Sequence, residues 1–179
     1  MQIIFTADNT FFAKLIRYCT KRSWLRSART SHTMLKLSEP DQNWLIQTNE
    51  KGLHLDWWHK VQQQAKIVFM FDVLNVNETA FNECLDEIFD EFVWKTFDVF
   101  GMVGMLVVCV WYCLTKKKIK NPFGQSTALI CSEAIYRLFK KLEQKTGVKY
   151  FNDEDVETIF PEELLIECLE NPALYRLVK

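Results

Sequence analysis

The order of apolar and polar residues divides the chain into strands and amphipathic helices. Period-two alternation, or a short apolar run between turn residues, predicts strands at 2–7, 31–37, 44–48, 53–56, 67–73 and 173–178. Apolar residues at helical spacing predict helices that begin after Asp8, at Asn77, near Leu129 and at Pro161, with a short helix or turn at 57–63. Because short turns join successive strands, we expect an α+β fold in which a mostly antiparallel sheet packs against helices.

No internal repeat, low-complexity tract or linker interrupts this pattern, so we expect a single domain over residues 1–179. An apolar fraction of 49% and a charged fraction of 25% are typical of soluble globular proteins. The net charge of −1 gives no general reason to expect a nucleic-acid partner. The first residues show no basic segment followed by an apolar one. We therefore expect no secretory signal, and a cytoplasmic protein with free thiols.

One apolar run, residues 97–114, has two interpretations. It carries a single acidic residue, and three lysines at 116–118 follow it, as in a transmembrane helix with a positive flank. However, its uncharged part, residues 99–114, is 16 residues long, whereas a span needs roughly 20. Gly101 and Gly104 also suit close packing. We therefore expect a buried or peripheral-membrane helix, with a true span as the alternative.

The helix that begins near Leu129 carries the first candidate for chemistry, Cys131. Ser126 or Thr127 can cap this helix, which places Cys131 in its first turn. Free backbone N–H groups and the positive end of the helix dipole favour a thiolate there, and they supply donors for an oxyanion. The alternative is a small buried hydrophobe, because Ala134 shares its face and free cysteines are mostly core residues.

A thiolate nucleophile needs a base, and His32 is the candidate. It starts a predicted strand directly after a polar, basic loop, as an active-site residue at the edge of a sheet would. Gln47, in the neighbouring predicted strand, can orient the imidazole; the alternative is a solvent-facing glutamine on a half-exposed strand. His54 and His59 show no matching signature, and we interpret them as surface or structural histidines.

The cysteines and histidines do not indicate a metal site. None of the six cysteines forms a C-x-x-C pair. The three histidines are not arranged with the cysteines as zinc ligands would be. We expect neither a metal nor a cofactor.

Short motifs around these residues follow the order found in a known family. They are Ser-His-Thr-Met-Leu-Lys-Leu at 31–37, Leu-Ile-Gln-Thr at 45–48 and Ile-Cys-Ser-Glu at 130–133, and the segments 97–101 and 120–124 are also similar. In these motifs the chain resembles the circularly permuted NlpC-like papain-fold amidases of the YaeF/YiiX type. The resemblance implies a permuted papain-like fold, with the apolar run inside the folded domain rather than across a membrane.

Carried over by position, the resemblance implies that Cys131 is the nucleophile and His32 the base. Gln47 stands where the family commonly has Glu. A glutamine can accept the imidazole N–H but adds no negative charge, so the imidazolium would be less stabilised. The family's opening Gly-Asp is also absent, and residues 2–5 are Gln-Ile-Ile-Phe.

The expected function is that of a cysteine-dependent hydrolase, an amidase, peptidase or acyl-ester hydrolase that works through an acyl-enzyme. Related folds act on peptides, peptidoglycan-like amides or lipid acyl groups, so the substrate class is open at this stage. Two alternatives remain: a papain-fold binding or interaction protein with little or no activity, and a small membrane-associated protein anchored by the helix at 97–114. The oligomeric state is also open, as is peripheral contact with a membrane.

Overall fold

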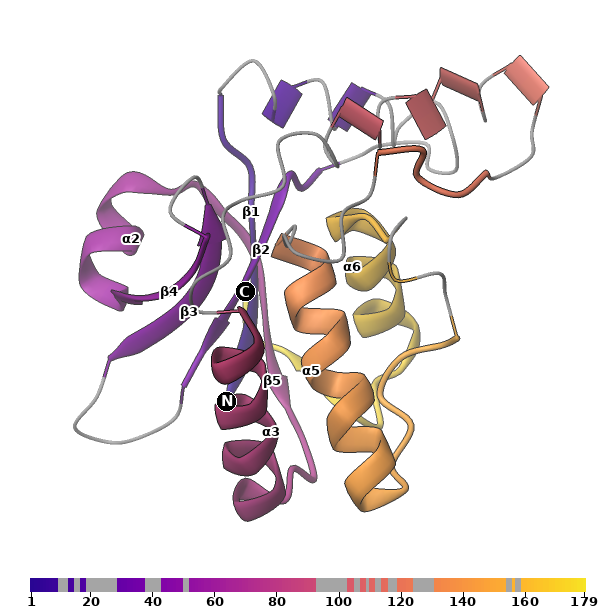
Figure 1. The fold of residues 1–179 in the computed structure, drawn as a ribbon. Coiled ribbons are helices and arrows are strands. Elements are labelled where there is room, and N and C mark those ends of the chain that lie inside the picture. The colour runs from indigo at the N-terminus through magenta and orange to yellow at the C-terminus, as the bar shows by residue number, and fades with distance from the viewer. Residues whose placement is uncertain are drawn as a thin grey trace.

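The structure of the protein is a computed structural model. It describes residues 1–9, 13–14, 17–18, 29–37, 43–49, 52–92, 103–104, 107–108, 110–111, 114–115, 119–123, 131–153, 156 and 159–179. The strands in this part of the chain are β1 (Gln2–Thr6), β2 (His32–Lys36), β3 (Trp44–Asn49), β4 (Gly52–Trp57), β5 (Ile67–Val73) and β6 (Tyr175–Leu177). The helices are α2 (Trp58–Gln64), α3 (Glu78–Phe92), α5 (Cys131–Thr146) and α6 (Pro161–Glu170) (Figure 1).

The strands form one six-stranded sheet in the order β4-β3-β2-β1-β5-β6, and every neighbouring pair is antiparallel. The α+β class and the antiparallel sheet are therefore confirmed, and the successive strands β2, β3 and β4 pair with one another as the short turns between them indicated. The pairing of Thr6 with His32 sets the end of β1 beside the start of β2. The permuted papain-like arrangement stays a prediction.

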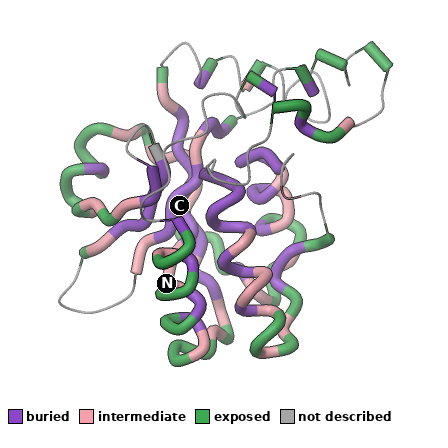
Figure 2. Tube along the Cα trace, in the orientation of Figure 1, coloured by how far each residue is buried: buried purple, intermediate pink, exposed green. Residues whose placement is uncertain are grey.

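Successive residues of the strands point to opposite faces of the sheet, and each face packs into its own apolar core. Ile3 and Phe5 of β1 belong to the large core, which also takes in α3, α5 and α6. Ile4, between them, belongs to a smaller core with Val61 of α2. Figure 1 shows α2 on one side of the strands, apart from α3, α5 and α6, and Figure 2 shows the sheet interior and the inner side of α5 as buried. Leu142 of α5 is fully buried, and burying such a side chain contributes about 1.5–3 kcal/mol.

Local capping chemistry fixes the helix ends where the sequence predicted them. The Asn77 side chain accepts a hydrogen bond from the N–H of Ala80 (3.0 Å) and so caps α3. The α5 helix ends before Gly147, whose positive φ of 73° is readily adopted by glycine. Pro161 is the first residue of α6, where its missing N–H costs nothing.

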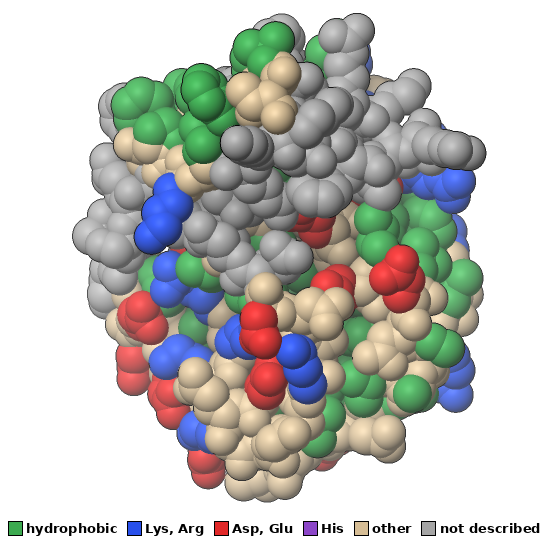
Figure 3. Space-filling view, turned by 90° about the vertical axis from the view of Figure 1, so that its right-hand side faces the viewer, with side chains coloured by type: hydrophobic (Ala, Val, Ile, Leu, Met, Phe, Trp, Pro, Cys, Tyr) green, Lys and Arg blue, Asp and Glu red, His purple; other side chains and the backbone are tan. Residues whose placement is uncertain are grey.

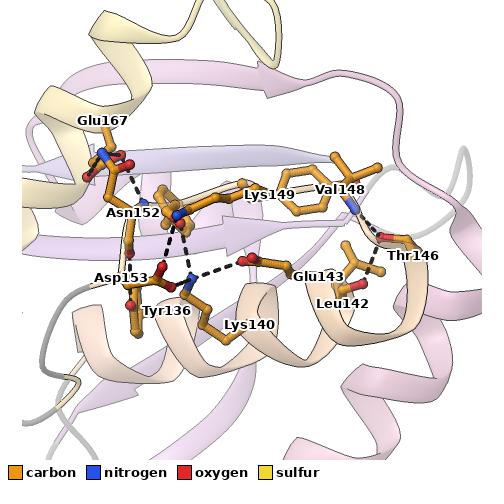
Figure 4. Close-up of polar contacts among 12 residues, drawn as sticks. Tyr136, Lys140, Leu142, Glu143, Thr146, Val148, Lys149, Asn152, Asp153 and Glu167 are labelled. Carbon is orange, nitrogen blue, oxygen red and sulfur yellow. Dashed lines mark hydrogen bonds and ion pairs between the residues drawn. The ribbon is translucent and has the colours of Figure 1, made fainter.

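A surface network holds the segment 148–153 against α5 (Figure 4). The Lys140 ammonium lies 2.6 Å from the carboxylate of Asp153 and 2.9 Å from that of Glu143. Hydrogen bonds and charge from Lys140, then Lys149, lower the pKa of Asp153 to about 2. Water screens exposed ion pairs, so this network orients the segment more than it stabilises the fold.

The apolar run at 97–114 is described only in part, and it is not covered as expected. Gly104 is buried, and a side chain there would collide with Asn121, which agrees with the predicted close packing. Val108 is also buried. The apolar row formed by its other described residues is 40–77% exposed and comprises Val103, Val107, Val110, Trp111 and Leu114. The buried interpretation of this segment therefore does not hold for the apolar row, and the peripheral-membrane interpretation stays a prediction.

Figure 3 shows hydrophobic side chains gathered at the upper end of the molecule, where the described residues between 103 and 115 lie in Figure 1. Within the described ranges, no helix combines the length and apolar character that crossing a membrane requires. The predicted caps Ser126 and Thr127, and most of the helix expected after Asp8, lie outside the described residues.

Candidate active site

The structure brings Cys131, His32 and Gln47 together from three separate elements. Cys131 is the first residue of α5, His32 is the first residue of β2, and Gln47 lies in β3. The His32 ring hydrogen-bonds with the sulfur of Cys131 and with the side chain of Gln47. Cys131 is 6% exposed and Gln47 8% exposed, while His32 keeps part of its surface accessible. Gln47 is thus buried, and the alternative of a solvent-facing glutamine on a half-exposed strand does not hold.

The surroundings of Cys131 favour its thiolate. Burial is the largest single influence and opposes ionisation. The charge and hydrogen bond of His32 act against it, and the backbone N–H groups of Thr33 and Ser132 also donate to the sulfur. Together these partners lower the pKa of Cys131 below its ordinary value. Cys131 is therefore buried and yet easier to ionise than a free thiol.

His32 responds in the opposite direction. Burial alone would lower the pKa of His32, but the charge and hydrogen bond of Cys131 raise it, followed by the charge of Asp8 and the hydrogen bond of Gln47. The net effect is a raised pKa. A lowered thiol pKa and a raised imidazole pKa have the same cause, a contact that favours a thiolate beside an imidazolium.

Two other buried cysteines show what burial does without such partners. Cys84 and Cys168 are free thiols at 0% and 1% exposure. Burial raises the pKa of Cys84, and it raises that of Cys168 well above the ordinary value. Since all three thiols are buried, the difference at Cys131 comes from its neighbours.

The side chain of Gln47 has two further contacts, both from β4. Its amide nitrogen donates to the carboxylate of Asp56 at 3.1 Å and lies 3.4 Å from the Nε2 atom of His54. The Nδ1 atom of His54 in turn lies 2.9 Å from the carbonyl oxygen of Gly52, to which it donates. These contacts agree with the structural one of the two interpretations that the sequence left open for His54.

A buried carboxylate from α6 holds the chain just before His32. Glu162 is 4% exposed and accepts hydrogen bonds from the N–H of Arg29 (3.0 Å), the N–H of Thr30 (3.0 Å) and the hydroxyl of Thr30 (2.7 Å). Thr30 itself is fully buried. Glu162 thereby fixes the backbone that leads into β2 and presents the imidazole.

The same end of α6 also fixes the start of α5. The Ser132 hydroxyl donates to the carbonyl oxygen of Ile159 at 2.7 Å, and the pair is buried. Because Ile159 lies just before α6, one segment of the chain braces the residues next to both Cys131 and His32.

The sequence analysis missed the roles of Asp8, Asp56 and Glu162. Asp8 served only to mark the start of an expected helix, and Glu162 is one of two acids after Pro161, a common pattern at a helix start. The short turn expected between the strands at 44–48 and 53–56 did contain a signal for Asp56, because it places the polar side chains of β4 beside those of β3. No comparable local signal exists for Glu162.

Among the described residues, no group of three histidine, cysteine, aspartate or glutamate side chains is placed to hold a metal ion. Comparison with models of protein families, with curated proteins and with solved structures found no match to this chain. The likeness to permuted NlpC-like amidases therefore rests on the motifs quoted from the sequence.

Proposed function

We propose that this protein is a cysteine-dependent hydrolase in which Cys131 is the nucleophile, His32 the general acid and base, and Gln47 the residue that orients the imidazole. One observation carries the proposal. A buried thiol whose pKa is lowered hydrogen-bonds with a histidine whose pKa is raised, and that histidine is itself held by a buried amide. The order of the motifs and their likeness to permuted NlpC-like amidases support the same reading.

The reaction would proceed through an acyl-enzyme. The Cys131 thiolate forms a bond to the carbonyl carbon of an amide or ester, and the π-electron pair of the carbonyl moves to its oxygen. Backbone N–H groups at the start of α5 would stabilise that oxyanion. When the carbonyl re-forms, the bond to the leaving nitrogen or oxygen breaks, and the imidazolium of His32 gives that atom its proton.

Hydrolysis of the thioester would complete the cycle. The imidazole of His32, now neutral, accepts a proton from water as the water oxygen attacks the acyl carbon. Collapse of the second tetrahedral intermediate releases the carboxylic acid and restores the Cys131 thiolate beside an imidazolium. The substrate would be a peptide, a peptidoglycan-like amide or a lipid acyl group, since each presents a carbonyl that this sequence of steps can use.

Thiol reactivity tests the proposal without knowledge of the substrate. Iodoacetamide labelling across a pH series, followed by peptide mapping, should modify Cys131 before Cys84 and Cys168, which serve as internal controls with the opposite pKa direction. H32A should slow labelling of Cys131 near neutral pH by about tenfold or more, the effect of one pKa unit. Incubation with an activated acyl ester should then add an acyl group to the Cys131 peptide of the wild type only.

Labelling that follows exposure alone and does not respond to H32A would contradict the proposal. Cys131 would then be a core residue, and the chain a binding protein with no thiol chemistry. The C131A variant separates the outcomes further, because acylation that persists in it would have to occur at another residue.

A further inference from the structure

The carboxylate of Asp56 contacts the amide of Gln47 and fixes which way that amide faces. Asp56 Oδ2 accepts a hydrogen bond from Gln47 Nε2 at 3.1 Å. An ionised carboxylate can only accept hydrogen bonds, so the atom that faces it must be the amide nitrogen. The assignment of nitrogen and oxygen in Gln47 thus follows from its partner.

His54 reinforces this orientation. Its Nδ1 atom donates to the carbonyl oxygen of Gly52, so in the neutral ring Nε2 is an acceptor, and it faces Gln47 Nε2 at 3.4 Å. Both hydrogens of the Gln47 amide are therefore directed toward β4. The oxygen Oε1 is left for His32, and it can only accept the N–H of the imidazole.

Asp56 also places a negative charge next to an amide that has none. Its side chain is 16% exposed. Burial works to raise the pKa of Asp56, but the N–H of Trp57 and the nearby ammonium of Lys60 outweigh it, so the pKa is lowered and the group is ionised at neutral pH. Lys60 lies 3.3 Å from Oδ1, and its own side chain is 51% exposed, so water screens much of its charge.

We propose that Asp56 is a positioning residue for His32 that acts through Gln47, by fixing the amide oxygen toward the imidazole and by supplying the negative charge that a glutamine lacks. The inference rests on the proposed function and deepens it. Cys131, His32, Gln47 and Asp56 then form one chain of contacts, in which the charge lies one side chain further from the imidazole than a glutamate at position 47 would place it.

This arrangement changes what a glutamate at position 47 would do. In Q47E alone, two carboxylates would face each other where an amide and a carboxylate now meet, so one of them would take up a proton at neutral pH. Q47E therefore should not speed Cys131 labelling near neutral pH, contrary to what position 47 alone would suggest. In Q47E/D56N the single carboxylate lies next to His32, and the new asparagine amide at position 56 donates a hydrogen bond to that carboxylate. This double variant should therefore speed Cys131 labelling.

The test is the pH profile of Cys131 labelling in five proteins: the wild type, D56N, Q47E, Q47E/D56N and a matched control, D72N. Asp72 also accepts a hydrogen bond from a glutamine amide on a neighbouring strand, Gln2 at 2.8 Å, but on the β1–β5 side of the sheet. D56N should slow labelling near neutral pH by about threefold to tenfold, which corresponds to half to one pKa unit, because His32 loses its proton more readily there, and D72N should not. Q47E/D56N should label faster than Q47E at the same pH.

The other groups that face this chain of contacts stay unchanged in these five proteins: Asp8 near His32, and Lys60 and His54 near Asp56. If D56N does not fold, K60Q replaces it, because K60Q keeps the carboxylate and removes its counter-charge; it should speed labelling of Cys131 near neutral pH. Circular dichroism of each variant establishes that the fold is retained.

The outcomes separate this inference from the proposed function. If Cys131 labels early and H32A slows it, but D56N matches D72N, then Asp56 does not act on His32 and only the inference fails. A K60Q profile equal to that of the wild type, where D56N is unfolded, overturns it as well. If Cys131 never labels ahead of Cys84 and Cys168, the proposed function itself fails.

Discussion

Removing the carboxylate of Glu162 should unfold the protein more easily and disturb the candidate active site at the same time. Glu162 is buried in the first turn of α6, and its Oε2 atom accepts all three hydrogen bonds from Arg29 and Thr30. Thr30 and Glu162 are 132 residues apart in the chain, so this contact joins α6 to the residues that lead into β2. In E162A, two backbone N–H groups and one hydroxyl would lose their acceptor.

The size of the effect follows from those three donors. A buried donor left without a partner costs about 1–3 kcal/mol. The E162A variant no longer buries a carboxylate, which offsets part of the loss, so we expect the free energy of unfolding to fall by about 3–5 kcal/mol. For a domain of this length, that corresponds to a decrease in Tm of about 10 °C. E162Q keeps one acceptor oxygen without the charge and should lose about half as much.

Urea denaturation and calorimetry measure these changes, and E167A is the matched control. Glu167 lies on the same helix and also accepts three contacts, from the backbone N–H and the side-chain amide of Asn152, but at the surface. E167A should cost less than about 1 kcal/mol. Iodoacetamide labelling of Cys131 should also slow in E162A, because Thr30 directly precedes the Ser31–His32 step. Equal destabilisation by E162A and E167A would refute the reasoning.

Two further predictions concern pH and the apolar row. The pKa of His32 is raised in the folded protein, so the stability that His32 contributes is lost as pH rises through its folded-state pKa. The pKa of Cys131 is lowered, so the stability that Cys131 contributes is lost as pH falls through its folded-state pKa. The stability difference between wild type and C131S should therefore be largest between those two values and shrink at both ends; a difference that changes in one direction across the whole range would argue against an ion pair. Trp111 and Val107 are exposed, so W111K/V107K should bind less of a hydrophobic dye with an unchanged Tm, and a large fall in Tm would show that they pack against the protein.

The elements that the sequence predicted well are those whose signals are local. Asn77, Gly147 and Pro161 mark helix ends because a cap or a positive φ acts on backbone groups a few residues away. The strands from β2 to β4 follow from alternation and from short turns, which fix both the pairing and the side of the sheet that each residue faces.

The contacts that position the candidate site could not be predicted in the same way. Glu162 meets Thr30 only because α6 packs beside the end of β2, and no pattern within α6 indicates that partner. The exposure of the apolar row was likewise not predicted, since a run of apolar residues does not say which neighbours will cover it. Both depend on how distant parts of the chain pack together.

Three buried cysteines in the described part of the chain show how far a residue type alone can support an argument about chemistry. Cys84, Cys131 and Cys168 are all nearly inaccessible, and each lies on a helix that packs into the core. Periodicity describes all three as small hydrophobes, and burial acts to raise the pKa of each. Only at Cys131 is that tendency reversed, because a histidine from β2 and two backbone N–H groups meet the sulfur where the helix begins. The argument for chemistry at this thiol therefore depends on its partners, and it extends outward from them to Gln47 and Asp56.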